Sequence, residues 1–151
     1  MPLTQRITED LKAAMKAGNK LRLETLRMIR AQIIEFEKKG LDRAMNEEDE
    51  MSILMAAAKK RKEAIEIFTK AGRMELAEQE TQELEIISEY LPKQLSREDA
   101  EKIIENLIQQ SGAASMKDIG KVMPGAMKEL KGKIDSKVIS EIVKQKLEAT
   151  S

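Results

Sequence analysis

An all-α fold of two helical domains is expected for this chain of 151 residues, and three observations lead to that expectation. Apolar side chains recur every three to four positions, a spacing typical of amphipathic helices rather than of strands. Aromatic residues make up only 2% of the chain, whereas sheets are rich in aromatic and β-branched side chains. Charged residues make up 36%, which is typical of long helices with solvated outer faces.

The first domain is expected to cover residues 1–91 and to contain about four helices. The apolar pattern breaks at Gly18 and again at Gly40, and glycine is the usual residue just beyond a helix C-terminus. These positions therefore end the first and second helices. The apolar residues that share one side of the second helix are Leu26, Ile29, Ile33 and Phe36.

The third and fourth helices follow a polar segment. Asn46 precedes the acids Glu47, Glu48 and Asp49. Such a sequence favours a helix N-terminus because the amide caps free N–H groups and the acids stabilise the positive end of the dipole. The third helix is expected to end at Ala71, before Gly72, and the fourth to run from about Arg73 to Leu91. The fourth helix has six glutamates and one arginine, which predicts packing against the basic second and third helices.

The second domain is expected to cover residues 92–151. Pro92 disfavours a helical conformation of the residue before it and so ends the fourth helix. Ser96 begins a fifth helix, which ends at Gly112, and two more short helices follow. Pro124 lies inside the apolar pattern of the sixth helix, so we expect that helix to kink or to break just before it.

The composition excludes several classes of function. The chain has no cysteine and no histidine, which argues against disulfides, zinc and iron–sulfur sites, and Ser-His-Asp or Cys-His catalysis. No catalytic residue, cofactor or metal is therefore expected. No run approaches the roughly 18 apolar residues of a membrane span, and the start of the chain lacks the apolar core of a signal peptide. A cytoplasmic protein that does not bind membranes is expected.

Three charged residues fall on the predicted apolar faces of the first domain. Projection at 100° per residue places Arg22, Lys62 and Glu80 among the inward residues of the second, third and fourth helices. Buried charges must be paired. Three interpretations remain open: an ion pair or network inside the domain, a binding or catalytic cluster where the helices meet, and an error in the helical projection.

The strongest candidate for a binding surface lies between Ser115 and Leu147. This stretch has eight lysines against four acids, a net charge of +4, and three glycines. Glycine permits close approach of another backbone, and the N-termini of the last two helices are expected to offer free N–H groups to anions. A phosphate backbone read by its shape is one interpretation, and a solvated lysine face is the other. The candidate contact residues are Lys117, Lys121, Lys128, Lys131, Gly132, Lys133 and Lys137.

The sequence resembles the GatB/YqeY family over essentially its whole length. The matching stretches are MKAGNKLRLETLRMIRA from Met15, KKRKEAIEIFTKAGRMELAEQETQELEIISEYLPKQLS from Lys59, and GAASMKDIGKVMPGAMKELKGKIDSKVISEIV from Gly112. Residues that match the family's C-terminal pattern are Gly120, Lys121, Val122, Met123, Leu130, Lys131, Gly132, Lys133, Asp135 and Lys137. Pro124 and Ser136 depart from that pattern, which puts the geometry of the local turns in question.

This resemblance implies a helical N-terminal domain followed by a domain similar to the tail of GatB, one of the chains of the glutamine-dependent amidotransferase. That enzyme converts Glu-tRNA(Gln) or Asp-tRNA(Asn) to the amide form, its chemistry lies outside the tail, and the tail contacts tRNA. The resemblance therefore implies a non-catalytic tRNA-binding or amidotransferase-related module, with tRNA and a protein of translation or aminoacyl-tRNA amidation as partners. Two alternatives stay open, an adaptor that binds another protein and an accessory of a carbon–nitrogen ligase with glutamine as amido-N-donor.

Overall fold

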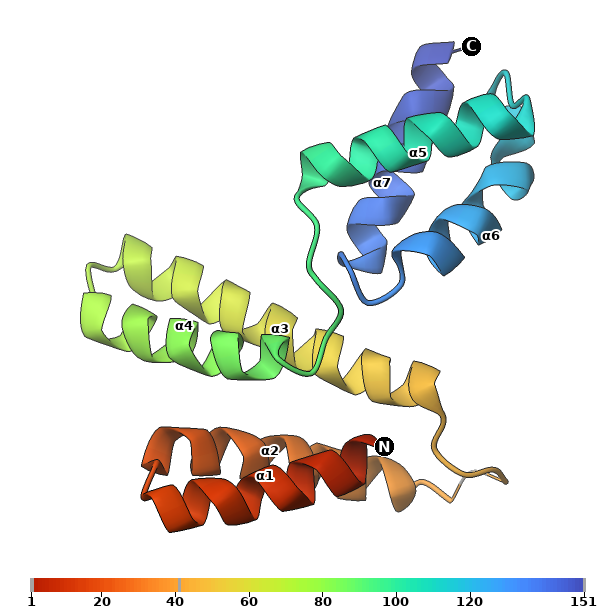
Figure 1. The fold of residues 1–151 in the computed structure, drawn as a ribbon. Helices are drawn as coiled ribbons and strands as arrows, with labels where there is room; N and C mark the ends of the chain where they lie inside the picture. Colours follow the sequence, from red (N-terminus) through yellow and green to blue (C-terminus); the bar gives the residue numbers. More distant parts are fainter. Residues whose placement is uncertain (1, 41, 151) are drawn as a thin grey trace. The chain divides into compact units, whose positions relative to one another are not determined.

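The computed structural model describes residues 2–40 and 42–150, and the regular structure of this part of the chain is entirely helical (Figure 1). The predicted all-α fold is confirmed. The chain divides into two compact units, Met1–Leu91 and Pro92–Ser151. Each unit has an apolar core of its own.

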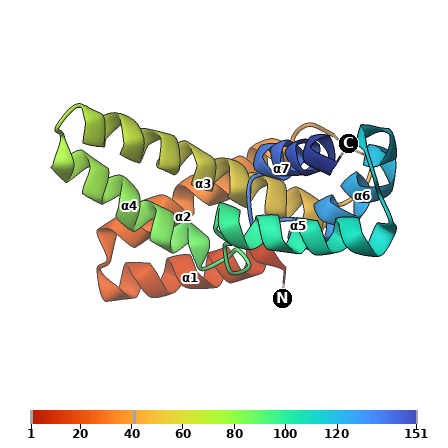
Figure 2. The same ribbon diagram turned by 90° about the horizontal axis from the view of Figure 1, so that it is seen from above.

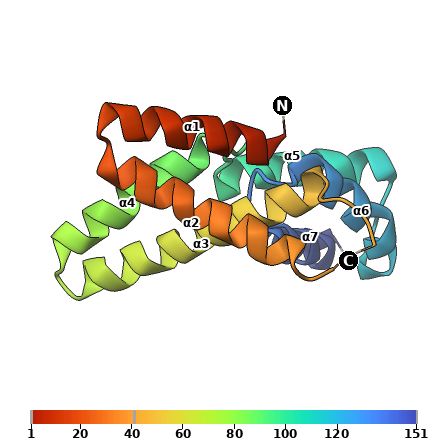
Figure 3. The same cartoon turned by 90° about the horizontal axis from the view of Figure 1, so that it is seen from below.

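The N-terminal unit consists of two antiparallel helical hairpins, and the first packs across the second (Figure 3). Its helices are α1 (Leu3–Ala17), α2 (Lys20–Glu37), α3 (Glu47–Lys70) and α4 (Met74–Ser88). The apolar stripes of these helices meet in one cluster because they recur at helical spacing. The largest fully buried side chains of this cluster are Ile7, Leu26, Ile29, Ile33 and Ile87.

The ends of α3 and α4 follow from local hydrogen bonds. Asn46 caps α3 as predicted, since its side chain accepts the N–H of Asp49 at 3.0 Å and the Asp49 carboxylate accepts the N–H of Asn46 at 3.0 Å. Helix α4 ends at Ser88, three residues before the predicted end. The N–H groups of Tyr90 and Leu91 donate to the carbonyls three residues back, and these tight turns replace the helical pattern.

The C-terminal unit is a three-helix domain (Figure 2). It contains α5 (Arg97–Ser111), a short 3₁₀ segment η1 (Met116–Asp118), α6 (Ile119–Leu130) and α7 (Ser136–Thr150). Its core is built from aliphatic side chains, since residues 92–151 include no aromatic residue. The largest fully buried side chains are Ile104, Leu130, Ile139, Ile142 and Leu147.

The predicted break before Pro124 is wrong, because α6 continues through this residue as one helix. Proline lacks an N–H group, so residue 124 cannot donate the usual helical hydrogen bond to the carbonyl of Gly120. Gly120 is exposed in the first turn of α6, where water can reach its carbonyl oxygen.

Among the helices of the described residues, none is long and apolar enough to cross a membrane.

Candidate functional site

The candidate lysines begin at η1, which leads into α6. Ser115 caps this segment, its hydroxyl accepting the N–H of Lys117 at 3.3 Å. The Asp118 carboxylate accepts the N–H of Ala114 at 2.9 Å and lies 3.4 Å from the ammonium group of Lys121. The N–H of Ala114, together with Lys121, holds the pKa of Asp118 below its ordinary value. An acid therefore occupies the start of α6, where a free anion site was expected.

The solvent-facing side of α6 combines lysines with bare backbone. Lys121 and Lys128 are seven residues apart and both exposed, so they lie on the same side of the helix, about 10 Å apart along its axis. Gly125 lies between them on that side, and a Cβ atom at Gly120 or Gly125 would meet nothing within 4 Å. Packing within the unit therefore gives no reason for glycine at these two helical positions.

The turn between α6 and α7 corrects one candidate. Gly132 is buried rather than open, and its φ of 75° lies in the left-handed region that glycine adopts most readily. Its carbonyl oxygen accepts the side-chain amide N–H of Gln94 at 2.7 Å. Gly132 therefore shapes the turn internally and offers no surface for a close phosphate approach. Lys131 is exposed beside it, and Lys133 is half-buried.

The start of α7 is also occupied by an acid of the chain itself. The carboxylate of Asp135 accepts the N–H of Lys137 at 3.1 Å. The expectation of free N–H groups at the N-terminus of α7 is therefore wrong. At α6 the carboxylate of Asp118 accepts the N–H of Ala114 and caps no N–H group of the helix, so the expectation stays a prediction there. The negative charge of Asp118 at that terminus leaves lysine side chains as the main candidates to hold an anion.

The lysines differ in their ionic partners. Lys121 pairs with Asp118, whereas Lys117, Lys128, Lys133 and Lys137 form no ion pair with another residue in the described ranges. Two other cations of the C-terminal unit are neutralised by acids of α5 and α7. Arg97 lies 3.3 Å from Glu101 and 3.4 Å from Glu141, and Lys146 pairs with Glu105. Four lysines without an ion pair in the described ranges therefore lie around η1, α6 and the start of α7, while Lys93, Lys102 and Lys144 are exposed elsewhere in the unit.

A second charged cluster lies inside the N-terminal unit. Its centre is Arg61, only 8% exposed, with its Nε atom 3.8 Å from Glu80 and 3.7 Å from Glu83. Burial, followed by a hydrogen bond that protonated Glu83 donates to the neighbouring Glu80 carboxylate, raises the pKa of Glu83. The guanidinium group also contacts the sulfur atom of Met28 on α2. The cluster therefore links three helices of the unit.

This cluster corrects the prediction for Lys62, which is exposed. The inward face of α3 is rotated by one residue, so Arg61 occupies the position that was assigned to Lys62. Sequence analysis missed Arg61 and Glu83, although two signals could have identified them. The planar guanidinium group of arginine suits a buried pair better than the ammonium group of lysine does, and Glu83 is one helical turn from Glu80. The contacts of Arg61 all come from side chains of the same unit, which favours a structural role.

Arg22 takes part in a different contact near the end of α4. It donates to the carboxylate of Glu89 at 2.6 Å, and its side chain is 27% exposed, so the pair is not buried. Next to it, Tyr90 donates its hydroxyl proton to Asp10 on α1, and the guanidinium group of Arg6 lies 4.8 Å from the centre of the tyrosine ring. Burial and the bond to Asp10 raise the pKa of Tyr90 well above its ordinary value. These contacts tie α1 and α2 to the end of α4.

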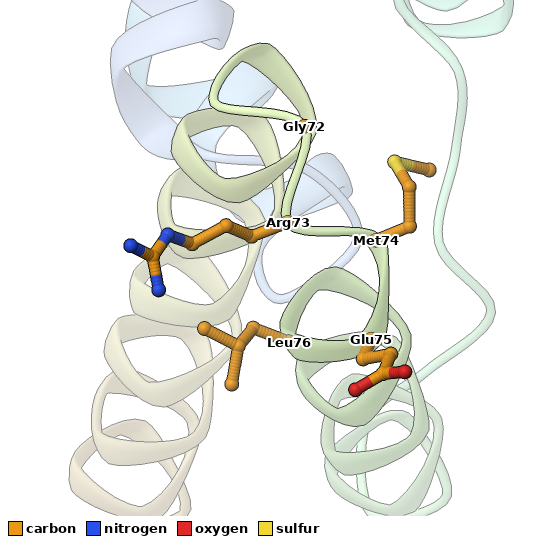
Figure 4. A pocket seen from close by; sticks show the side chains of 5 residues that line it. All are labelled: Gly72, Arg73, Met74, Glu75 and Leu76. Atoms are coloured by element: carbon orange, nitrogen blue, oxygen red, sulfur yellow. The ribbon is translucent and has the colours of Figure 1, made fainter.

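The turn between α3 and α4 contains an open depression of about 430 Å³ (Figure 4). Arg73 and Leu76 project to one side of the turn, and Met74 and Glu75 project to the other. Met74 is 59% exposed and Leu76 38%, and Ile67 on the last turns of α3 is 65% exposed. The C-terminal unit exposes no comparably large apolar side chain in its described part. The two units therefore present different kinds of surface.

Residues 4–147 match the Yqey-like protein family. The chain belongs to this family. The match spans both units and confirms the resemblance that the sequence motifs indicate. Within the described residues, no group of three or more acidic residues is arranged to hold a metal ion.

Three relatives illustrate the range of the family. An uncharacterized protein of Schizosaccharomyces pombe is 33% identical over 90 residues, covering 60% of this chain and 72% of the relative. Altered inheritance of mitochondria protein 41 from Pyrenophora tritici-repentis is 28% identical over 150 residues, covering 93% and 78%. The protein of the same name from Vanderwaltozyma polyspora is 30% identical over 120 residues, covering 75% and 64%. The expected cytoplasmic location stays a prediction, since two of these relatives are named as mitochondrial.

Proposed function

We propose that this chain is a non-catalytic RNA-binding module that holds tRNA by its sugar-phosphate backbone. The observation that carries the proposal is the group of lysines around η1, α6 and α7, of which Lys117, Lys128, Lys133 and Lys137 form no ion pair among the described residues. Lysine ammonium groups are flexible point charges that bind phosphate without reading the base sequence. The full group, named here the lysine surface, consists of Lys117, Lys121, Lys128, Lys131, Lys133 and Lys137.

The composition of the C-terminal unit supports recognition of shape. Proteins that hold single strands stack the bases on aromatic rings, and residues 92–151 contain none. Contacts to phosphate and ribose along a folded RNA need no such rings. The lysine surface is therefore suited to a structured RNA such as tRNA.

The relation to tRNA amidation is part of the same proposal. It is supported by the similarity of the C-terminal stretch to the tail of an amidotransferase chain, whose chemistry lies in other domains. A chain without cysteine or histidine would then bring tRNA to a partner enzyme, with glutamine as nitrogen donor, rather than catalyse the transfer. The purified chain is expected to show no glutaminase activity.

A filter-binding titration with total tRNA at several salt concentrations tests the proposal. Affinity should fall steeply with salt, with a logarithmic slope of about −0.7 to −0.9 for each phosphate neutralised. Replacing Lys131, Lys133 and Lys137 by glutamine should make the slope shallower by the contribution of about two to three phosphates.

The matched control replaces three exposed lysines outside the lysine surface. A variant with Lys16, Lys102 and Lys144 changed to glutamine alters the net charge equally and should change the slope much less. Equal slopes for the two triple variants would remove the lysine surface from the proposal. No measurable binding of tRNA by the unsubstituted chain would overturn the proposal itself.

A protein adaptor is the second candidate, and the exposed apolar residues at the end of the α3–α4 hairpin favour it. Ile67, Met74 and Leu76 are large and uncovered near one end of this hairpin, and exposed large apolar side chains can contribute to interaction surfaces. A pull-down from lysate treated with nuclease separates the two candidates. Protein partners that remain after RNA is removed, and that are lost with Met74→Glu, would support the adaptor.

A further inference from the structure

A short segment before α5 holds the turn that carries two lysines of the lysine surface. The side-chain amide of Gln94 donates both of its N–H groups, one to the carbonyl of Pro92 at 2.9 Å and one to the carbonyl of Gly132 at 2.7 Å. The next residue, Leu95, donates its backbone N–H to the carbonyl of Lys133 at 2.8 Å. A glutamine amide has only two donors, and both are used here.

These bonds fix the backbone on which the lysines stand. The carbonyls of Gly132 and Lys133 are consecutive in the turn, and consecutive residues before α5 bind them. The N–H of Lys133 is in turn bonded to the carbonyl of Leu130 at 3.0 Å. The turn is therefore held on both sides, by the end of α6 and by Gln94 and Leu95.

We propose that Gln94 is a positioning residue for RNA binding, acting through the α6–α7 turn on Lys131 and Lys133. This inference rests on the RNA binding proposed above. Both N–H donors of Gln94 face carbonyl groups of the chain, so its proposed effect does not require it to donate a hydrogen bond to the ligand. Its effect is to keep the two lysines in one arrangement before RNA arrives, which lowers the ordering cost of binding.

The experiment measures tRNA affinity and its salt slope for three variants of the full chain. Gln94→Leu removes both donors without changing the charge, and Gln94→Glu turns carboxylate oxygens toward the two carbonyls. Gln110→Glu, an exposed position on α5, controls for the added negative charge. We expect affinity to fall about three- to tenfold for Gln94→Leu, further for Gln94→Glu, and little for Gln110→Glu.

A structural role alone is separated from positioning by a double-mutant cycle. Gln94→Leu is combined with Lys131→Gln and Lys133→Gln, and the effect of Gln94→Leu should then nearly disappear because the lysines through which it acts are absent. An equal loss of affinity in both backgrounds would overturn the inference. So would an unchanged salt slope in Gln94→Leu.

Hydrogen exchange at the Leu95 amide reports whether the bonds around the turn have opened. Faster exchange in Gln94→Leu, with exchange in α5 and α7 unchanged, shows that the variant is folded and only the turn is released. With the turn released, wild-type affinity would refute positioning and leave the lysine surface intact. If the unsubstituted chain binds no tRNA at any salt concentration, both the proposed function and this inference fail.

Discussion

The two units of this protein use charge in opposite ways. The N-terminal unit buries a guanidinium group, Arg61, between the carboxylates of Glu80 and Glu83. In the described part of the C-terminal unit no polar or charged side chain is buried, and the lysines lie at or near the surface. The N-terminal unit in turn exposes large apolar side chains, which the described part of the C-terminal unit does not.

This difference separates charges that organise the fold from charges available to a ligand. A buried cation must be paired, and its removal leaves uncompensated carboxylates. An exposed lysine is solvated and contributes little to stability, so its presence in numbers around one helix needs another reason. Substitutions should therefore affect the stability of the N-terminal unit and the binding properties of the C-terminal unit.

The largest effect is expected for Arg61→Ala. The substitution leaves Glu80 and Glu83 without their counter-ion and opens space between α2, α3 and α4, so the free energy of unfolding should fall by about 3 kcal/mol. Tyr90 is the only tyrosine of the chain, which has no tryptophan, so its fluorescence follows urea unfolding of the N-terminal unit. The neighbouring Lys62→Ala should cost little because Lys62 is exposed. Similar losses for the two variants would contradict the assignment of Arg61 as the buried cation.

Helical periodicity predicted that a cation of α3 faces inward, but it selected the wrong one. In the run Lys59–Lys62 all four residues are basic, and an error of one residue is 100° on the helix. The position of the inward face depends on how α2 and α4 pack against α3, which no pattern within α3 contains. The helices and the family, by contrast, follow from local spacing and motifs, and both are confirmed.

A smaller effect is expected for Gly132→Ala. Its φ of 75° strains any residue with a Cβ atom, and its buried position leaves little freedom to relax. The C-terminal unit should lose about 1 to 2 kcal/mol of stability, measured by hydrogen exchange of amides in α5 and α7. Gly112→Ala is the matched comparison, since Gly112 has a φ of 71° but is exposed with open space around it. A smaller loss at Gly132 than at Gly112 would argue against the buried turn.

Gly132 also marks a limit of prediction from sequence. A glycine among lysines fits a phosphate site as well as it fits a left-handed turn, and the amino-acid sequence alone does not distinguish these two interpretations. The distinction comes from Gln94, 38 residues away, whose side chain bonds the Gly132 carbonyl. A contact over that distance depends on the packing of α5 against α6 and α7. The exposure of Lys121 and Lys128 could be predicted because their positions lie outside the apolar stripe of α6.

Glu83 in the N-terminal unit and Asp118 in the C-terminal unit should make contributions to stability that change in opposite directions when the pH falls. The raised pKa of Glu83, which faces Arg61, Glu80 and Glu24, means that the folded state holds this proton more tightly than the unfolded state. Its contribution to stability is full below the unfolded value of 4.5 and is lost as pH rises through the folded value. Asp118 has a lowered pKa, so its contribution is present above 3.8 and is lost as pH falls.

Urea unfolding followed through Tyr90 between pH 4.5 and neutrality measures the Glu83 contribution. The unsubstituted chain should lose stability over this range relative to Glu83→Gln, which cannot titrate. The matched variant Glu85→Gln, at an exposed position of α4, should keep the original dependence. The chemical shift of the Ala114 amide should follow Asp118 at lower pH. If the free energy of unfolding varied with pH in the same way for the unsubstituted chain and for Glu83→Gln, Glu83 would not hold a proton more tightly in the folded state than in the unfolded state.

The smallest effect on stability, and the most informative about function, is expected for Gly125→Ala. A Cβ atom here meets nothing within 4 Å, and alanine favours a helix over glycine, so the C-terminal unit should gain about 0.5 to 1 kcal/mol. If RNA approaches the backbone of α6 between Lys121 and Lys128, the added methyl group should instead weaken tRNA binding. Stability and affinity would then move in opposite directions. Ser140→Ala on α7, a helical site outside the lysine surface, is the control and should leave affinity unchanged. A Gly125→Ala variant that is more stable and binds tRNA as tightly as the unsubstituted chain would show that ligand approach does not explain glycine at this exposed helical position.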